Sequence, residues 1–95
     1  MIILHVTYTT KAGQKEAFVN AVAAAGIDAA SRAEAGNIRY DYFYAAQQDN
    51  AVLLVEEWEN EAVLEAHKHT AHFQQLAGIK EQYVEQTVVE KHIVA

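Results

Sequence analysis

Four side chains that could do chemistry lie close together in the sequence: Glu56, Trp58, His67 and His72. Glu56 and Trp58 are two residues apart in an apolar segment, so on a β-strand they point to the same face. A carboxylate on a buried face needs a hydrogen bond or an opposite charge, and His67 is a partner that a following helix can supply. This group therefore offers a proton acceptor, an N–H donor and aromatic surface to a small-molecule pocket.

Each of these residues also has a purely structural explanation. Glu56 could brace the next helix, and a tryptophan at a strand end is usually a core residue. A single inward histidine is more often a satisfied core group than a ligand-binding one. His67 lies four residues after Val63 on the apolar side of its predicted helix, and His72 follows in the next turn, so both imidazoles could line one cavity.

Aromatic side chains add a second feature, a ladder of Tyr40, Tyr42 and Tyr44 at alternating positions. Such a ladder could stack on a planar ligand, although cross-strand packing explains it without any ligand. A metal site is not predicted. His67 and His69 point about 200° apart on a helix, H-E-x-x-H is missing, and there is no cysteine. Without a G-x-G-x-x-G or a phosphate-binding loop, no flavin or nicotinamide cofactor is expected either.

The composition indicates one globular domain spanning residues 1–95, because a chain of this length encloses a single hydrophobic core. Thirteen acidic and seven basic residues give a formal charge of −6 without a basic cluster, so nucleic acid and anionic membrane are not expected partners. The absence of cysteine fits a reducing compartment. With no signal-peptide pattern and no long apolar run, a cytoplasmic location is expected.

The hydrophobic pattern predicts six elements in the order βαββαβ. Apolar alternation predicts strands at residues 2–9, 37–46, 51–59 and 85–94, and helical spacing predicts helices at 14–34 and from 60 to about 78. Gly36 is the expected stop of the first helix, and Gly26 is a weak point within it. Asn60 is expected to cap the second helix, with Thr70 starting a new turn.

These elements predict an α+β fold, a ferredoxin-like split antiparallel sheet with both helices on one face. Val52 and Leu54 on one side of the third strand are matched by Leu53 and Val55 on the other, and the helices can cover only one side. The uncovered side should also hold Ile3, His5, Asp41 and Phe43. We therefore expect this face to meet a second copy of the chain, giving a homodimeric α/β barrel.

The whole chain resembles the antibiotic biosynthesis monooxygenase family of small dimeric α+β barrels. The resemblance lies in Ala12-Gly13-Gln14, Ala35 to Asp41, the E-x-W of Glu56 and Trp58, and the A-H-x-x-T-x-H-F of residues 66–73. It implies a pocket between the sheet and the helices of each subunit. Haem-degrading relatives of this fold carry an asparagine on the first strand where this chain has Val6, and that difference argues against haem.

The resemblance implies oxidation of a small hydroquinone or anthrone by O2, without metal or flavin. Such chemistry requires a base that forms the substrate anion inside a dry cavity. His67 is the expected base, with Glu56 orienting it or stabilising its cation and Trp58 donating its N–H to a substrate oxygen. The side chains expected to contact the substrate are Val6, Tyr8, Tyr40, Tyr42, His72 and Phe73.

Two other functions stay open from the sequence. The same groups could move protons on a small phosphorylated signalling sugar, with His67 and His72 as acid and base, as in the relative that processes phosphorylated autoinducer-2. A convincing phosphate site is missing for that reaction, since the only candidates are Arg39, Lys68 and Lys91. The third hypothesis is a non-catalytic dimeric module that binds an apolar metabolite.

Overall fold

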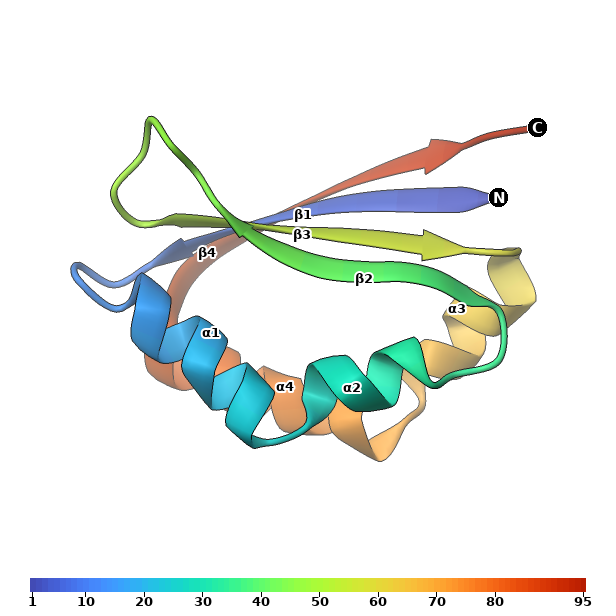
Figure 1. Cartoon of the computed structure of the whole chain (residues 1–95), viewed down its shortest axis with the longest axis horizontal. Helices are drawn as coiled ribbons and strands as arrows, with labels where there is room; N and C mark the ends of the chain where they lie inside the picture. Colours follow the sequence, from blue (N-terminus) through green and yellow to red (C-terminus); the bar gives the residue numbers. More distant parts are fainter.

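The chain folds as a four-stranded antiparallel sheet with all its helices on one face (Figure 1). This computed structural model describes all 95 residues. The strands are β1 (Ile2–Thr10), β2 (Asn37–Tyr44), β3 (Ala51–Trp58) and β4 (Val84–Ile93), and the helices are α1 (Lys15–Ala24), α2 (Ile27–Arg32), α3 (Glu61–Lys68) and α4 (Ala71–Tyr83). The strand order β2-β3-β1-β4 confirms the predicted ferredoxin-like α+β class.

The first predicted helix is two helices. Gly26 has a φ of 71°, in the left-handed region, so the helix predicted over residues 14–34 breaks between α1 and α2. The chain then turns at Glu34 and Gly36 into β2, where the φ of Gly36 is 84°. Helix α2 contacts α4, and the turn that follows α2 reaches His67 and His72 through Glu34.

The second helical region is also divided, at the position that the sequence indicated. The side chain of Asn60 accepts a hydrogen bond from the amide of Val63 at the start of α3, and Thr70 accepts one from Phe73 at the start of α4. Helix α4 continues to Tyr83, five residues beyond the predicted end at Gly78. None of the helices has the length and apolar character needed to cross a bilayer.

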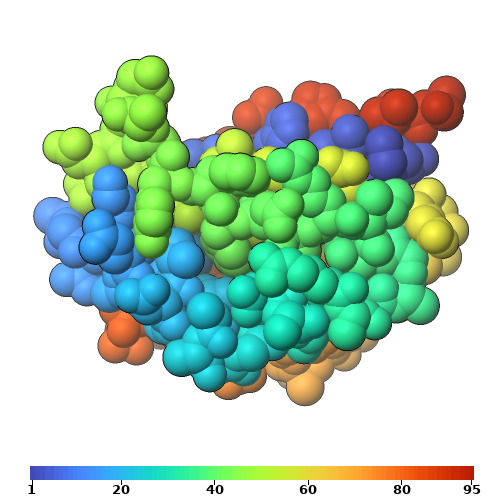
Figure 2. Space-filling model, in the orientation of Figure 1, coloured from blue at the N-terminus to red at the C-terminus, as the bar shows by residue number.

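The core lies between the sheet and the helices. Alternate residues of β1, beginning at Ile2, point to the helices and are buried, and Phe18 and Val22 of α1 and Leu64 of α3 close over them. The space-filling view shows the side where β2, in green, meets α1 and α2, in light blue to teal, with the β2–β3 turn standing out from the body (Figure 2). Layer packing thus fixes which face of each strand can form a site.

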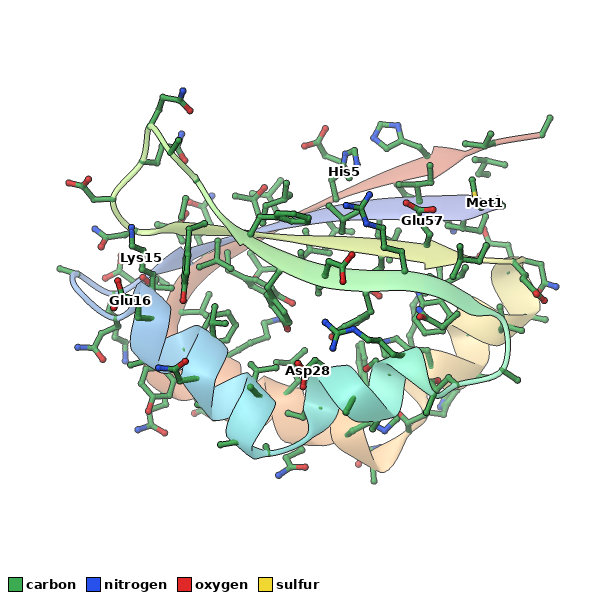
Figure 3. The ribbon with its side chains drawn as sticks, in the orientation of Figure 1. Met1, His5, Lys15, Glu16, Asp28 and Glu57 are labelled. Atoms are coloured by element: carbon green, nitrogen blue, oxygen red, sulfur yellow. The ribbon has the colours of Figure 1, made fainter.

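The opposite face of the sheet carries no helix. His5 and Glu57 point away from the helices in Figure 3, and the register pairs His5 with Val55 and Asp41 with Val55. Phe43 lies beside Leu53 on the same face and remains 43% exposed. The predicted division of β3 into two apolar sides is therefore correct, and what covers the outer side stays a prediction.

Candidate functional site

The site is built on a line of four residues that crosses the sheet from edge to edge. The register places Tyr40 of β2 beside Glu56 of β3, Glu56 beside Leu4 of β1, and Leu4 beside Lys91 of β4. Since paired residues of antiparallel strands share a face, all four point toward the helices. This line forms one end of the floor of a cavity beneath α3 and α4.

The cavity has a volume of about 290 Å³ and mostly apolar walls. That is close to the lower end of ordinary ligand pockets, roughly 300 Å³, and suits a molecule of one or two rings. Its lining consists of Leu4, Val6, Tyr8, Tyr40, Glu56, Leu64, His67, Lys68, Phe73, Leu76, Ala77, Lys80, Thr87, Val89 and Lys91. Strands thus supply the floor, and α3 and α4 supply the roof.

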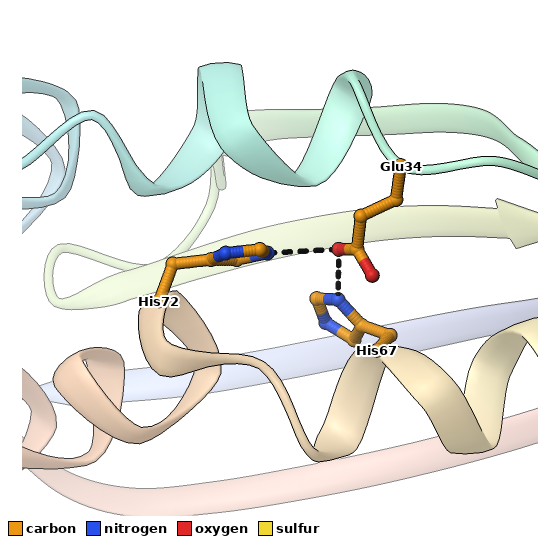
Figure 4. Close-up of side chains that lie close together, drawn as sticks. All are labelled: Glu34, His67 and His72. Carbon is orange, nitrogen blue, oxygen red and sulfur yellow. Dashed lines mark hydrogen bonds and ion pairs between the residues drawn. The ribbon is translucent and has the colours of Figure 1, made fainter.

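Glu34 joins the two histidines of the helical layer (Figure 4). Its Oε2 lies 2.5 Å from Nδ1 of His67 and 2.8 Å from Nε2 of His72. His67 occupies the last turn of α3, His72 the first turn of α4, and Glu34 the turn after α2, so three separate segments converge there. An ionised carboxylate only accepts hydrogen bonds, so neutral His67 carries its proton on Nδ1.

The other ring nitrogen of His67 is the one that can act as a base. Nε2 of His67 lies 3.8 Å from Oε1 of Glu56, too far for a strong hydrogen bond, and both residues line the cavity. Burial lowers the pKa of the His67 imidazole, and the hydrogen bond to Glu34 opposes that change. His67 is therefore a neutral proton acceptor at neutral pH, held in one tautomer by Glu34.

Glu56 is a carboxyl group whose pKa lies close to neutral pH. Burial raises its pKa to about 7, while the hydrogen bond from the Trp58 indole, 3.1 Å from Oε1, works in the opposite direction. The negative charge of Glu34 adds to the increase, and the positive charge of Lys68 reduces it. At neutral pH the Glu56–His67 pair can therefore either accept a proton or donate one.

Two tyrosines of the cavity stay protonated. Burial raises the pKa of Tyr40 to about 12 and raises that of Tyr8 further. Each can therefore present a neutral hydroxyl and a ring face to a ligand. The hydroxyl of Tyr42, outside the lining, is buried without a hydrogen-bond partner, which makes it a polar atom inside the apolar core.

Glu34, His67 and His72 also offer three ligand atoms within 4.8 Å of one another. Two imidazole nitrogens and one carboxylate oxygen form a donor set suited to a divalent transition metal. The set differs from the rejected combination of His67, His69 and His72, because the side chain of His69 is 75% exposed and bonds to Glu65. A metal here would have to displace the two hydrogen bonds to Glu34, so it would compete with the proton on Nδ1 of His67.

The structure brings most of the predicted site residues together. The cavity is lined by six of them, which are Val6, Tyr8, Tyr40, Glu56, His67 and Phe73. Trp58 lies just beyond the cavity wall, fully buried, with its ring centroid 4.6 Å from that of His67. Its N–H donates to Glu56, so it positions that carboxylate instead of pointing at the cavity. Tyr42 and His72 also lie outside the lining.

Glu34 and Lys80 were missed by the sequence analysis. Glu34 is separated from His67 by 33 residues, and no local pattern connects them. Lys80 follows Phe73, Leu76 and Ala77 at helical spacing, so a helix extended past Gly78 would have placed it on the cavity wall. Of the three phosphate-site candidates that the sequence offers, Lys68 and Lys91 line the cavity and Arg39 does not.

Comparison with protein families assigns the chain over most of its length. The model described as antibiotic biosynthesis monooxygenase matches residues 1–78. YcnE of Bacillus subtilis (strain 168), a candidate monooxygenase, is 36% identical over 74 residues, which are 78% of this chain and 76% of that protein. The family match contains the Glu34–His67–His72 group and Glu56, but ends before β4.

Solved structures extend the likeness to β4. PA3566 from Pseudomonas aeruginosa superimposes with a TM-score of 0.86 at 28% identity, covering 99% of this chain and 93% of that one. A conserved protein of unknown function from Bacteroides thetaiotaomicron gives a TM-score of 0.84 at 33% identity, covering 96% and 94%. The complete arrangement of sheet and helices is therefore shared with these proteins.

Proposed function

This chain belongs to the antibiotic biosynthesis monooxygenase family, and from that membership and the site geometry we propose a cofactor-independent monooxygenase. The proposed substrate is a small hydroquinone-like or anthrone-like aromatic compound, oxidised by O2. One observation carries the proposal. His67 has Nδ1 held by Glu34 and Nε2 on the side of Glu56, within a mostly apolar cavity.

The protein's part in such a reaction is to form and hold the substrate anion. Nε2 of His67 takes the proton of the phenolic or enolic hydroxyl, and the carboxylate of Glu34 stabilises the resulting imidazolium through Nδ1. The anion then transfers electrons to O2. One oxygen atom enters the product and the other leaves as water, so all the reducing electrons come from the substrate.

Surrounding groups favour the anion in two ways. Lys68 is close enough to influence the pKa values of both Glu56 and His67, so its positive charge also favours a phenolate formed between them. The buried side chains Leu4, Leu64 and Leu76 make the inner walls apolar, and apolar surroundings strengthen these electrostatic interactions.

The decisive experiment is oxygen uptake by metal-free protein with a panel of hydroquinones and anthrones. His67→Ala should reduce turnover by about 100-fold or more, because general-base catalysis typically contributes this much. His69→Ala is the matched control, since His69 belongs to the same helix end but is exposed and bonds to Glu65. Equal losses in the two variants, or no oxygen uptake with any member of the panel, would contradict the proposal.

A separate arm adds Mn2+, Fe2+ or Zn2+ to the metal-free protein. If His67 acts as the base, an ion bound by Glu34, His67 and His72 should lower the rate, because it takes the proton position on Nδ1. A rate that appears only with added metal would assign those three residues to a metal centre instead.

A second candidate has specific support from the lysines of the cavity. Lys80 joins the sequence candidates Lys68 and Lys91 on the cavity lining and adds positive charge to them, so proton transfer on a small phosphorylated substrate fits the site as well. The mostly apolar walls favour the aromatic substrate. Turnover of phosphorylated carbohydrates followed by NMR, without oxygen uptake, would support this isomerase, and binding without turnover would support a binding module.

A further inference from the structure

The cavity has two chemically different ends. At one end the line of Glu56, Leu4 and Lys91 crosses the sheet beneath His67. At the other end the register pairs Tyr8 with Thr87, and both line the cavity. Leu4 and Tyr8 are four residues apart on β1, which corresponds to about 13 Å along a strand. A ligand that fills the cavity is therefore elongated.

Lys80 stands at the end away from the acid–base pair. Its Nζ lies 5.5 Å from the centroid of the Tyr8 ring, and the side chain is half-buried. The other two lysines of the lining already have carboxylate partners, Lys68 with Glu65 at 3.7 Å and Lys91 with Glu61 at 2.5 Å. No carboxylate lies within ion-pair distance of Lys80, so its charge is left for a ligand.

The sign of this charge is opposite to that of the molecule. The chain carries a formal charge of −6, and three of its seven cationic side chains line this one cavity. The Tyr8 ring, 5.5 Å from Nζ, compensates part of the desolvation cost of this half-buried ammonium, and no carboxylate of the chain compensates the rest. Lys80 lies beyond residue 78, where the match to the family model ends, so the family pattern does not account for it.

We propose that Lys80 binds an anionic substituent of an elongated aromatic substrate whose reacting hydroxyl lies at the Glu56–His67 end. The inference rests on the proposed function for the identity of the reacting group, and adds the requirement for a negative charge at the far end. A carboxylate and a phosphate ester share the recognising chemistry, an anion that accepts N–H hydrogen bonds from an ammonium. Thr87, which pairs with Tyr8 and lines the same end of the cavity, brings a hydroxyl that can donate a further hydrogen bond.

The test is equilibrium binding to the full chain, measured by calorimetry without oxygen so that no turnover occurs. The probe is a hydroxynaphthoate whose hydroxyl and carboxylate lie at opposite ends of the fused rings. The corresponding hydroxynaphthamide has the same shape without the charge, and a hydroxynaphthyl phosphate replaces the carboxylate by a phosphate ester. We expect the carboxylate to bind about 10-fold more tightly than the amide, with the difference shrinking as salt is added.

Lys80→Gln should remove that difference, and Lys80→Arg should retain most of it. Lys15→Gln is the matched control, because Lys15 is also half-buried, also lies over a tyrosine ring, at 5.6 Å from the centroid of Tyr44, and is outside the cavity. This control should bind all probes like the unmodified chain. Tighter binding of the phosphate than of the carboxylate would identify the anion as a phosphate ester, and the reverse order would identify a carboxylate.

The inference is overturned if the amide binds as tightly as both anions, if no anion binds at millimolar concentration, or if Lys80→Gln weakens the amide equally. These outcomes are separate from the fate of the proposed reaction. Lys80-dependent anion binding without oxygen uptake would retain the inference and remove the monooxygenase. Oxygen uptake with hydroquinones, together with anionic probes that bind Lys80→Gln as tightly as the unmodified chain, would retain the monooxygenase and remove the inference.

Discussion

A single carboxylate oxygen, Oε2 of Glu34, accepts hydrogen bonds from both His67 and His72. This arrangement fixes the proton of His67 on the nitrogen that faces away from the cavity. It also offsets part of the loss of basicity that burial causes, since the interaction with Glu34 raises the pKa of His67. Glu34 thereby takes the orienting role that the sequence analysis gave to Glu56.

Replacing Glu34 should therefore make His67 a weaker base. In Glu34→Gln we expect the pKa of His67 to fall, because the stabilising negative charge is gone while burial and the nearby His72 and Lys68 still lower it. Titration of the His67 ring protons by NMR measures this directly. Glu65→Gln is the control, since Glu65 makes the equivalent contact to the exposed His69. An unchanged pKa of His67 in Glu34→Gln would show that the charge of Glu34 does not influence the His67 imidazole.

Glu56 should make stability fall with rising pH. Its folded-state pKa, about 7, is above the ordinary value of 4.5, so the folded chain binds this proton more tightly than the unfolded chain does. Folding then loses stability as pH rises from about 4.5 through 7, by up to about 3 kcal/mol for a shift of this size. Glu56→Gln removes the penalty and still accepts the Trp58 N–H.

Urea unfolding of Glu56→Gln and the unmodified chain at several pH values tests this linkage. The variant should be more stable at pH 8, with the difference disappearing by about pH 4.5, where the unmodified carboxyl is protonated in the folded state. A constant difference across this range would mean that the buried carboxyl does not titrate as described. The loss of the ionisable group at position 56 should also lower the apparent pKa of the pH–rate profile.

The turn between α2 and β2 positions one of the site residues, Glu34. Gly36 links the turn that carries Glu34 to β2, and a Cβ there would lie 2.6 Å from Cγ1 of Val63 in α3. Gly36 also has positive φ, a conformation that costs an L-residue about 1–2 kcal/mol. The tight contact holds the Glu34 turn against the helix that carries His67.

Gly36→Ala should destabilise the chain by about 3 kcal/mol or more, the sum of backbone strain and overlap with Val63. Gly13→Ala is the matched control, because Gly13 has a similar φ of 73° but open space around the added methyl. Thermal unfolding of both variants separates backbone strain, which both glycine substitutions introduce, from overlap with Val63, which only Gly36→Ala introduces. Similar losses in both would show that α3 moves away from the turn at little cost.

Local patterns were sufficient for the strands and caps, and insufficient where distant segments meet. Alternation placed β1 and β3 correctly, and Asn60 and Thr70 cap helices as expected from their side chains. Helical periodicity continues across Gly26, so the break into α1 and α2 could not be read from apolar spacing alone. The sequence predicts the end of α4 too early, at Gly78, and therefore does not place Lys80 on a helix. The role of Glu34 could not be predicted, because its contacts with His67 and His72 form only in the folded chain.

The outer face of the sheet is the expected dimer interface. Phe43 is 43% exposed there, beside Leu53, whereas Val55 is already buried within one chain. Phe43→Glu should therefore produce a folded monomer, since the symmetry of a dimer would bring two buried charges to the interface. Tyr44→Glu is the control, because the next residue of β2 is 49% exposed and points toward the helices.

Sedimentation equilibrium at micromolar concentration measures the outcome. We expect the unmodified chain and Tyr44→Glu to sediment as dimers and Phe43→Glu as a monomer with unchanged circular dichroism. The outer face also carries a network of ion pairs in which Arg39 contacts Asp41 and Glu57. A folded monomer for the unmodified chain would exclude this interface, and the apolar strip would need another partner.

The position of Trp58 gives the molecule an optical sensor of its own site. It is the chain's one tryptophan, so indole fluorescence comes from a single place, fully buried beside His67 and bonded to Glu56. A protonated imidazole quenches a neighbouring indole more strongly than a neutral one, and a dry environment shifts indole emission toward the blue. The emission of the unmodified chain can therefore report the charge state of the site and the arrival of a ligand, without a label and before any reaction begins.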